Sequence, residues 1–184
     1  MRILAISGSL REGSYNTVLA RAAAEVAPAG VEVELFEGLG AVPPYDPAAD
    51  IFPAPSAVRE LRSAIERSDG VLIVTPEYNG SLPGVLKNAI DWASRPHHES
   101  ALWGKTVAIA GASPGTYGAL WALNDLRRIL GIAGARVTEG ELAVAQAHER
   151  IDAEGRLADD GIRRRLGEQL RTLAEAAQPL PVAA

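Results

Sequence analysis

The chain of 184 residues has the length of one compact domain, and 47% of its residues are hydrophobic. Its 18 basic and 23 acidic residues give a net charge of −5, which disfavours a general nucleic-acid binder because such proteins carry a basic surplus. The lack of cysteine excludes disulfide scaffolds, cysteine zinc sites, thiolate nucleophiles and iron–sulfur ligation. No apolar run approaches the roughly 18 residues of a membrane span, and the apolar N-terminus is too short for a signal peptide. We therefore expect a soluble, cytoplasmic domain.

Short apolar segments alternate with longer amphipathic ones along the chain, and proline or glycine punctuates many of the boundaries. Strands are predicted at 3–6, 31–35, 71–74 and 106–110, with a less distinct fifth strand between 135 and 142. Helices are predicted at 16–26, 56–67 with Ser56 as N-cap, 83–94, 118–130 and 159–177.

This alternation predicts an α/β fold in which helices cover both faces of a parallel sheet, a three-layer α/β/α sandwich. Residues 1–177 are expected to form one domain and 178–184 a disordered tail. A proline-rich stretch, 43–55, is expected to form either an ordered excursion or a mobile loop.

Three segments that follow predicted strands are rich in Gly, Ser, Asn, Tyr and Pro. The segments that precede strands are short and lack this enrichment. The three are 8–16, 76–81 and 111–118. The carboxyl ends of parallel strands meet at one edge of the sheet, where ligands bind at the switch in strand order. These segments therefore predict a binding site, although any parallel fold also needs turns there.

The first of these segments has the features of an anion site. It joins a predicted buried strand to a helix start, whose unpaired N–H groups carry partial positive charge. Ser9, Ser14, Asn16 and Thr17 add short polar side chains, and Arg11 adds a fixed charge suited to phosphate. The alternative for Ser14 and Asn16 is simple helix capping.

Two better-known phosphate loops fit this segment poorly. Gly8 and Gly13 have the spacing G-x-x-x-x-G, but Ser14 stands where a nucleotide triphosphatase needs lysine. The dinucleotide pattern G-x-G-x-x-G is absent. A terminal monophosphate suits the segment better than a triphosphate.

The second segment offers a flat surface and backbone amides. Pro76 and Gly80 predict an extended turn, Tyr78 could lie against an aromatic ligand, and the amides of 77–80 could bond polar ring atoms. The alternative is that Tyr78 only covers the edge of the sheet. No neighbour in sequence tunes Glu77, so general acid–base chemistry is not expected there.

Three other patterns favour ordinary structure. His97, His98 and Glu99 have no evident third partner for a metal, so a solvated loop is favoured. Lys87 and Asp91 are expected to form a surface pair on a helix. Residues 111–115 match the serine-hydrolase pattern G-x-S-x-G around Ser113, but Pro114 lacks the N–H that half the oxyanion hole requires, and the triad would have to use His148.

Two motifs together carry a resemblance to a known family. They are Gly8-Ser9-Leu10-Arg11 with Ser14-Tyr15-Asn16, and the run from Thr75 to Trp92, TPEYNGSLPGVLKNAIDW. From Met1 to about Leu142 the chain resembles the NADPH-dependent FMN reductases, a family that includes bacterial quinone, chromate and azo reductases with a flavodoxin-like fold.

The resemblance implies a five-stranded sheet of order 2-1-3-4-5, bound FMN, and NADPH or NADH as co-substrate. It further implies transfer of two electrons from the nicotinamide through the flavin to an acceptor. Our hypothesis is that this transfer is ping-pong, with a quinone, free flavin or similar acceptor, and that it needs no catalytic side chain and no metal. The FMN-binding residues that the resemblance implies are Ser9, Arg11, Ser14, Tyr15 and Asn16 in the first segment, Pro76, Glu77, Tyr78, Asn79 and Gly80 in the second, and Ser113 in the third.

The resemblance also implies a homodimer or homotetramer, with the helices at 83–92 and 121–130 as candidate contacts. Gly80 is smaller than the aromatic residue of some relatives, which leaves the shape of the acceptor open. Two alternatives stay open for function: a flavodoxin-like electron carrier without NAD(P)H activity, and an interaction protein that keeps the fold without the cofactor.

Overall fold

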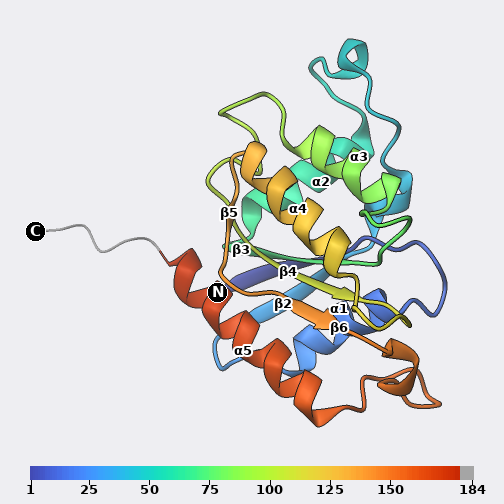
Figure 1. The fold of residues 1–184 in the computed structure, drawn as a ribbon. Coiled ribbons are helices and arrows are strands. Elements are labelled where there is room, and N and C mark those ends of the chain that lie inside the picture. Colours follow the sequence, from blue (N-terminus) through green and yellow to red (C-terminus); the bar gives the residue numbers. More distant parts are fainter. Residues whose placement is uncertain (179–184) are drawn as a thin grey trace, which may run out of the picture.

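A parallel sheet runs through the middle of the molecule, with helices on both of its faces (Figure 1). The computed structural model describes residues 1–178, so most of the predicted disordered tail lies outside the described residues. The strands are β1 (Arg2–Ser7), β2 (Glu32–Phe36), β3 (Gly70–Thr75), β4 (Thr106–Ala112), β5 (Arg136–Val137) and β6 (Leu142–Val144). Their order is β2-β1-β3-β4-β5, with β6 also paired to β4, and this confirms the predicted flavodoxin-like order.

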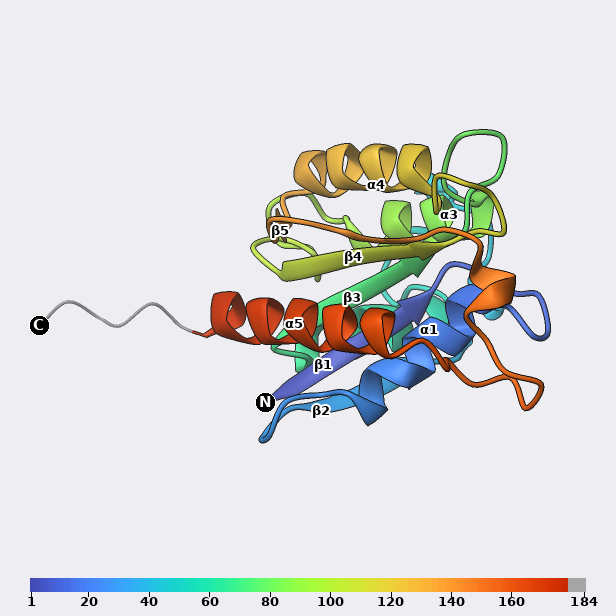
Figure 2. The same cartoon turned by 60° about the horizontal axis from the view of Figure 1, so that its bottom comes forward.

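The helices form the two outer layers of the sandwich (Figure 2). One layer holds α1 (Tyr15–Glu25) and α5 (Asp160–Ala177). The other holds α2 (Ser56–Arg67), α3 (Gly84–Ala93) and α4 (Leu120–Ile132). None of the helices in residues 1–178 has the length and apolar character that crossing a bilayer requires.

The continuous apolar run of β3 explains why this strand lies at the centre of the sheet. Every residue of the strand is buried. Val71 and Ile73 pack beneath α2, α3 and α4, whereas Leu72 and Val74 pack against α1 and α5. Successive side chains of a strand point to opposite faces, so a strand covered on both faces reads as unbroken hydrophobic sequence.

The predicted fifth strand is present as two short strands, β5 and β6, separated by 138–141. Arg127 on α4 explains the interruption. Its guanidinium donates to the carbonyls of Thr138 (2.9 Å) and Gly140 (3.0 Å) and pairs with Glu141 (2.9 Å). A side chain therefore satisfies carbonyls in the gap between the two strands, which sequence periodicity does not reveal.

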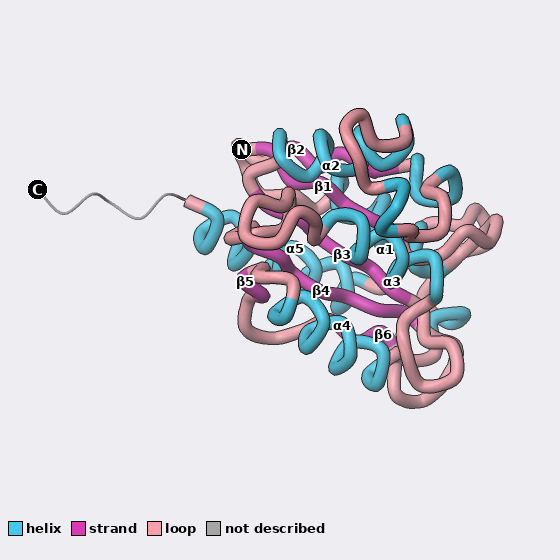
Figure 3. Tube along the Cα trace, turned by 90° about the horizontal axis from the view of Figure 1, so that it is seen from above, coloured by secondary structure: helices cyan, strands magenta, loops and turns pink. Residues whose placement is uncertain are grey.

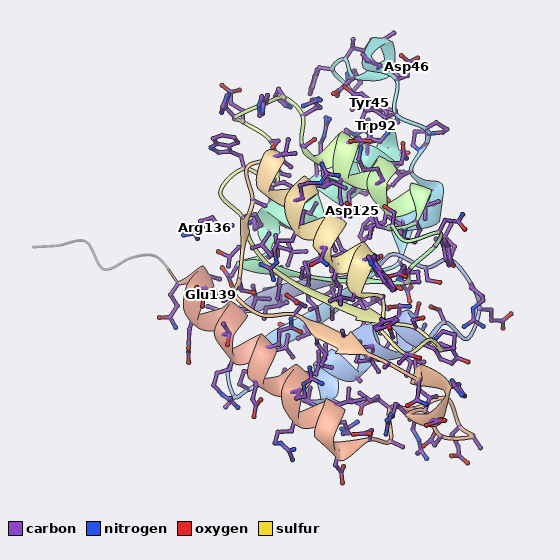
Figure 4. The ribbon with its side chains drawn as sticks, viewed as in Figure 1. Tyr45, Asp46, Trp92, Asp125, Arg136 and Glu139 are labelled. Atoms are coloured by element: carbon purple, nitrogen blue, oxygen red, sulfur yellow. The ribbon has the colours of Figure 1, made fainter. Side chains whose placement is uncertain are left out.

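The proline-rich stretch is an ordered excursion with its own small core. The indole of Trp92 donates to the carbonyl of Pro43 (2.8 Å), and the amide of Asn88 donates to the same oxygen (2.9 Å). The ring of Tyr45 meets Trp92 edge to face at 4.9 Å (Figure 4). The structure thus favours the first of the two predicted states.

The N-cap predicted for α2 is wrong by one residue. Ser56 is the first helical residue, Pro55 occupies the cap position, and no side chain caps the helix there. Pro55 has the extended backbone that a cap position requires, which leaves Ser56 to begin the helix.

Candidate functional site

Three loops leave the sheet at the same edge, because β1, β3 and β4 are parallel neighbours (Figure 3). We call them the first loop (8–14), the second loop (76–83) and the third loop (113–119). After β1 the chain turns outward to β2 and then returns to β3 on the other side of β1. The switch in strand order therefore lies between the first and second loops, which is where open α/β sheets bind ligands.

Backbone and side-chain hydrogen bonds hold the loops in one arrangement. The amide of Gly8 donates to the carbonyl of Val74 at the end of β3 (2.8 Å). In the third loop, Ser113 donates from its amide to Val144 of β6 (3.1 Å) and accepts at its carbonyl from Ala147 (3.0 Å). The site edge is therefore assembled from segments far apart in sequence.

The first loop ends in the predicted helix cap. The Ser14 hydroxyl oxygen accepts from the amide of Asn16 (3.2 Å), and no acidic residue lies in the first turn of α1. Arg11 is exposed, donates to the carbonyl of Gly13 (3.3 Å) and lies 5.2 Å from the ring centre of Tyr15. The positive helix end and the guanidinium thus lie together without a carboxylate in that turn to neutralise them.

Asn16 has a structural task that the sequence does not reveal. Its side-chain amide donates to the carbonyl of Ala112 (2.9 Å), and its side-chain oxygen accepts from the amide of the same residue (2.8 Å). This buried pair joins the start of α1 to the end of β4. Asn16 therefore braces the first loop against the third, which differs from a direct role in anion binding.

The second loop contains a tight turn. Tyr78 donates to the carbonyl of Ser81 (2.9 Å) and accepts from its amide (3.1 Å). Asn79 (φ 52°) and Gly80 (φ 76°) both have left-handed backbone, as a two-residue Asn-Gly turn requires. Pro76 is buried at the base of the loop, whereas the ring of Tyr78 is about half exposed at the edge.

Side chains on both sides of this turn are attached to α4. The carboxylate of Glu77 accepts from the amides of Trp121 (3.0 Å) and Ala122 (3.3 Å). The Ser81 hydroxyl donates to the carboxylate of Asp125 (2.7 Å), and this bond lowers the pKa of the Asp125 carboxyl below its usual range. Sequence reasoning missed these partners because each lies 44 or 45 residues away.

The third loop brings further polar and aromatic groups to the edge. The Ser113 hydroxyl oxygen accepts from the amide of Gly115 (3.1 Å). Tyr117 and Trp121 are largely exposed and meet edge to face at 5.0 Å. Gly111 lies so close to β3 that an added Cβ would come within 2.8 Å of the carbonyl of Thr75. Neither aromatic residue is among the predicted site residues.

A cavity of about 470 Å³ borders the first loop on the side of β2. Arg11 and Arg21 line it together with Phe36 and Glu37, and no residue of the second or third loop does. The cavity is therefore a neighbour of the three-loop edge and not a crevice between the loops.

The remaining candidate clusters lie away from this edge. The rings of His97 and His98 stack at 4.2 Å, and His98 meets Trp103 edge to face at 4.2 Å. Within residues 1–178, no group of three or more metal-binding side chains comes together. Lys87 and Asp91 form the expected pair at 2.7 Å.

The model of the NADPH-dependent FMN reductases matches residues 1–149. The chain belongs to this family. It is 41% identical over 174 residues to an NAD(P)H-dependent FMN reductase of Pseudomonas aeruginosa, covering 94% of this chain and 93% of that protein. It is 38% identical over 189 residues to a quinone reductase of Escherichia coli, covering 99% of this chain and 98% of that protein.

A solved structure is similar over almost the whole chain. It is FerB of Paracoccus denitrificans, a flavoenzyme NAD(P)H:(acceptor) oxidoreductase, with a TM-score of 0.84, 34% identity and 96% of each chain covered. The family assignment makes this chain a flavodoxin-like oxidoreductase with FMN as cofactor and NAD(P)H as reductant.

The residues at the three-loop edge suit FMN. Its phosphate is a dianion, and the first loop offers the Ser9 and Ser14 hydroxyls, the Arg11 charge and a helix start without acidic residues. Its ring system is flat, and the second loop offers the exposed Tyr78 and a Gly80 whose Cβ position is open space. The donor set and the shape of the edge therefore fit the cofactor.

Proposed function

We propose that this FMN reductase family member passes two electrons from NAD(P)H to a quinone, a free flavin or a similar acceptor by a ping-pong mechanism. Residues 1–177 would act as a single FMN-binding domain. Bound FMN supplies the hydride chemistry, so the protein needs no nucleophilic or acid–base side chain of its own. The observation that carries the proposal is that the first, second and third loops, which are rich in polar and glycine residues, lie together at the switch in strand order.

In this proposal the first loop holds the phosphate. Ser9 and Ser14 supply hydroxyl groups, Arg11 supplies a charge-assisted bond, and the backbone at Tyr15 begins the helix that faces the anion. Asn16 keeps its place in the site as the brace between α1 and β4.

The second and third loops border the flavin ring in this proposal. The turn around Asn79 and Gly80 brings backbone groups to the ring edge, Pro76 and Glu77 set the direction in which the chain enters the turn, and Tyr78 adds a flat side chain. Ser113 approaches from the third loop. The quinone reductase activity named for the Escherichia coli relative supports a quinone as acceptor.

Initial rates at several fixed quinone concentrations, with NADPH varied, test the mechanism. Ping-pong transfer predicts parallel double-reciprocal lines. Intersecting lines would contradict the order of steps. A protein that binds FMN but oxidises NADPH no faster than free FMN would instead support the electron-carrier alternative.

We also propose that two or more copies assemble through the face formed by α3 and α4. This face exposes Val85 and, most of all, Ile132, which is 70% exposed. Charged pairs border the apolar side chains, Lys87 with Asp91 and Asp125 with Arg128. A face of this composition suits contact with a second copy.

A further inference from the structure

We propose that Glu77 is a positioning residue, which seats the turn of the second loop on α4 and so sets the position of the ring-facing backbone. The proposal rests on the proposed function, because it assumes that this turn faces the flavin. It assigns to Glu77 a task distinct from contact with the cofactor, and it adds Ser81 and Asp125 as partners in that task.

The N-terminus of α4 lacks a cap of its own. Ala119 occupies the cap position with left-handed backbone (φ 68°) and offers no side-chain acceptor. The amide of Leu120 bonds to the carbonyl of Tyr117 (3.2 Å), and the Glu77 carboxylate accepts from the next two amides, those of Trp121 and Ala122. A carboxylate from another loop therefore serves as the helix cap, at the end where negative charge is favourable.

The second attachment lies one helical turn further along α4. There Asp125, on α4 (Figure 4), accepts from the Ser81 hydroxyl (2.7 Å) and lies 3.4 Å from the guanidinium of Arg128. Glu77 and Ser81 flank the turn, so both of its ends are fixed to the same rigid helix. Within the turn, Tyr78 and Ser81 exchange two backbone hydrogen bonds.

This arrangement separates the internal shape of the turn from its placement. The Asn79–Gly80 backbone and the Tyr78–Ser81 bonds define the shape. The contacts with α4 define where the turn stands relative to the first and third loops. Loss of Glu77 should therefore leave the fold intact but allow the turn to move, and a site whose parts move binds its ligand less tightly.

The variants Glu77→Ala and Glu77→Gln separate the acceptor function from the charge. Glutamine keeps an oxygen that accepts from the two amides, whereas alanine removes it. We expect Glu77→Ala to weaken FMN binding by up to about 30-fold, because bound FMN can recover at most the stability that the lost cap supplied, and Glu77→Gln to stay within about threefold of the native protein. FMN titration of the apoprotein, followed by flavin fluorescence, measures both.

Asp159→Ala is the matched control for an ordinary loss of a helix cap. Asp159 accepts from the amide of Ile162 (2.9 Å) at the start of α5, away from the turn. We expect Asp159→Ala to lower Tm at least as much as Glu77→Ala does, because it also removes the ion pair with Arg150 (3.0 Å), while leaving FMN affinity unchanged. An equal loss of FMN affinity in Asp159→Ala would overturn the proposal, because general destabilisation would then explain the effect.

Amide hydrogen exchange in the apoprotein tests the placement without any flavin. We expect faster exchange at the amides of 77–81 in Glu77→Ala, and a further increase when Ser81→Ala is added. Unchanged exchange at these residues would contradict the positioning role even if FMN affinity fell. Failure of the native protein to bind FMN would contradict the proposed function instead. The exchange experiment would still test whether Glu77 holds the turn in place, because it uses the apoprotein.

Discussion

Arg11 brings a full positive charge to the first loop, beside a helix start that contains no acid. If the phosphate of FMN lies there, Arg11→Ala removes a charge-assisted hydrogen bond and should weaken FMN binding by about 1–3 kcal/mol. Fluorescence titration of the apoprotein with FMN gives this difference directly. Unchanged affinity would count against the phosphate site.

Arg21→Ala is a control that locates the phosphate. Arg21 lies further along α1 and lines the cavity beside β2 together with Arg11, but it belongs to none of the three loops. We expect FMN affinity to change by less than about 0.5 kcal/mol, the usual size of a surface substitution. Because Ser9 and Arg11 also line this cavity, a loss equal to that of Arg11→Ala would place the phosphate at its Arg21 side, beside β2, and away from the start of α1.

Asn16 gives a second prediction for a single residue. Asn16→Ala leaves the buried amide and carbonyl of Ala112 without their partner, so we expect the free energy of unfolding to fall by about 2–3 kcal/mol. Asn124→Ala, on the exposed side of α4, should change it by less than about 0.5 kcal/mol. Chemical denaturation measures both, and equal effects would contradict the brace.

The sequence revealed those site residues whose partners are local. Ser14 caps the helix that begins at the next residue, and the Asn79–Gly80 pair predicts its own turn. Glu77 and Asn16 could be singled out as polar residues in suggestive loops, but their partners lie 44 to 96 residues away. Only the topology of the sheet brings such groups together.

Among the secondary-structure elements, α5 gives a prediction for pH dependence. The backbone hydrogen bond from Ile162, together with Arg150, lowers the pKa of the Asp159 carboxyl in the folded protein. The ionised Asp159 cap therefore stabilises the fold fully at pH values above the ordinary pKa of an aspartate. This stabilisation is lost as the pH falls through the lowered pKa of the folded protein. We expect Asp159→Asn to reduce the acid sensitivity of Tm, and an unchanged profile would contradict this.

The indole of Trp92 is one of several side chains that hold the proline-rich excursion, together with Asn88, which donates to the same carbonyl. Trp92→Phe keeps an aromatic ring in the small core but removes the hydrogen bond to the carbonyl of Pro43, so we expect stability to fall by about 1 kcal/mol. Limited proteolysis should show faster cleavage within 43–55, where the chain would be less firmly held. Equal resistance in the variant and the native protein would show that the hydrogen bond does not hold this segment.

Elements with strong periodicity could be predicted to within a few residues, whereas those shaped by distant side chains could not. The buried run of β3 and the amphipathic pattern of α5 contain their own signal. The split of the fifth strand depends on Arg127, and the order within 43–55 depends on Trp92 and Asn88. In both cases a side chain on a helix contacts a loop that is distant in sequence, and local sequence patterns do not show such contacts.

At the scale of the whole molecule, the face formed by α3 and α4 predicts assembly. Ile132→Glu places a charge in the proposed contact and should shift the protein toward the monomer. Ile51→Glu, at an equally exposed position in the excursion, should leave the assembly unchanged. Sedimentation velocity of the three proteins measures this, and a native protein that is monomeric at all concentrations would contradict the proposed contact.

The claim on which the account depends is that the three-loop edge of the sheet holds FMN in a form that NAD(P)H can reduce. The most direct measurement is the visible spectrum of the FMN-loaded protein, separated from free flavin by gel filtration, before and after anaerobic addition of NADPH. We expect flavin absorbance that elutes with the protein and bleaches on addition of NADPH. A colourless protein peak, with all of the flavin in the small-molecule fraction, would contradict it.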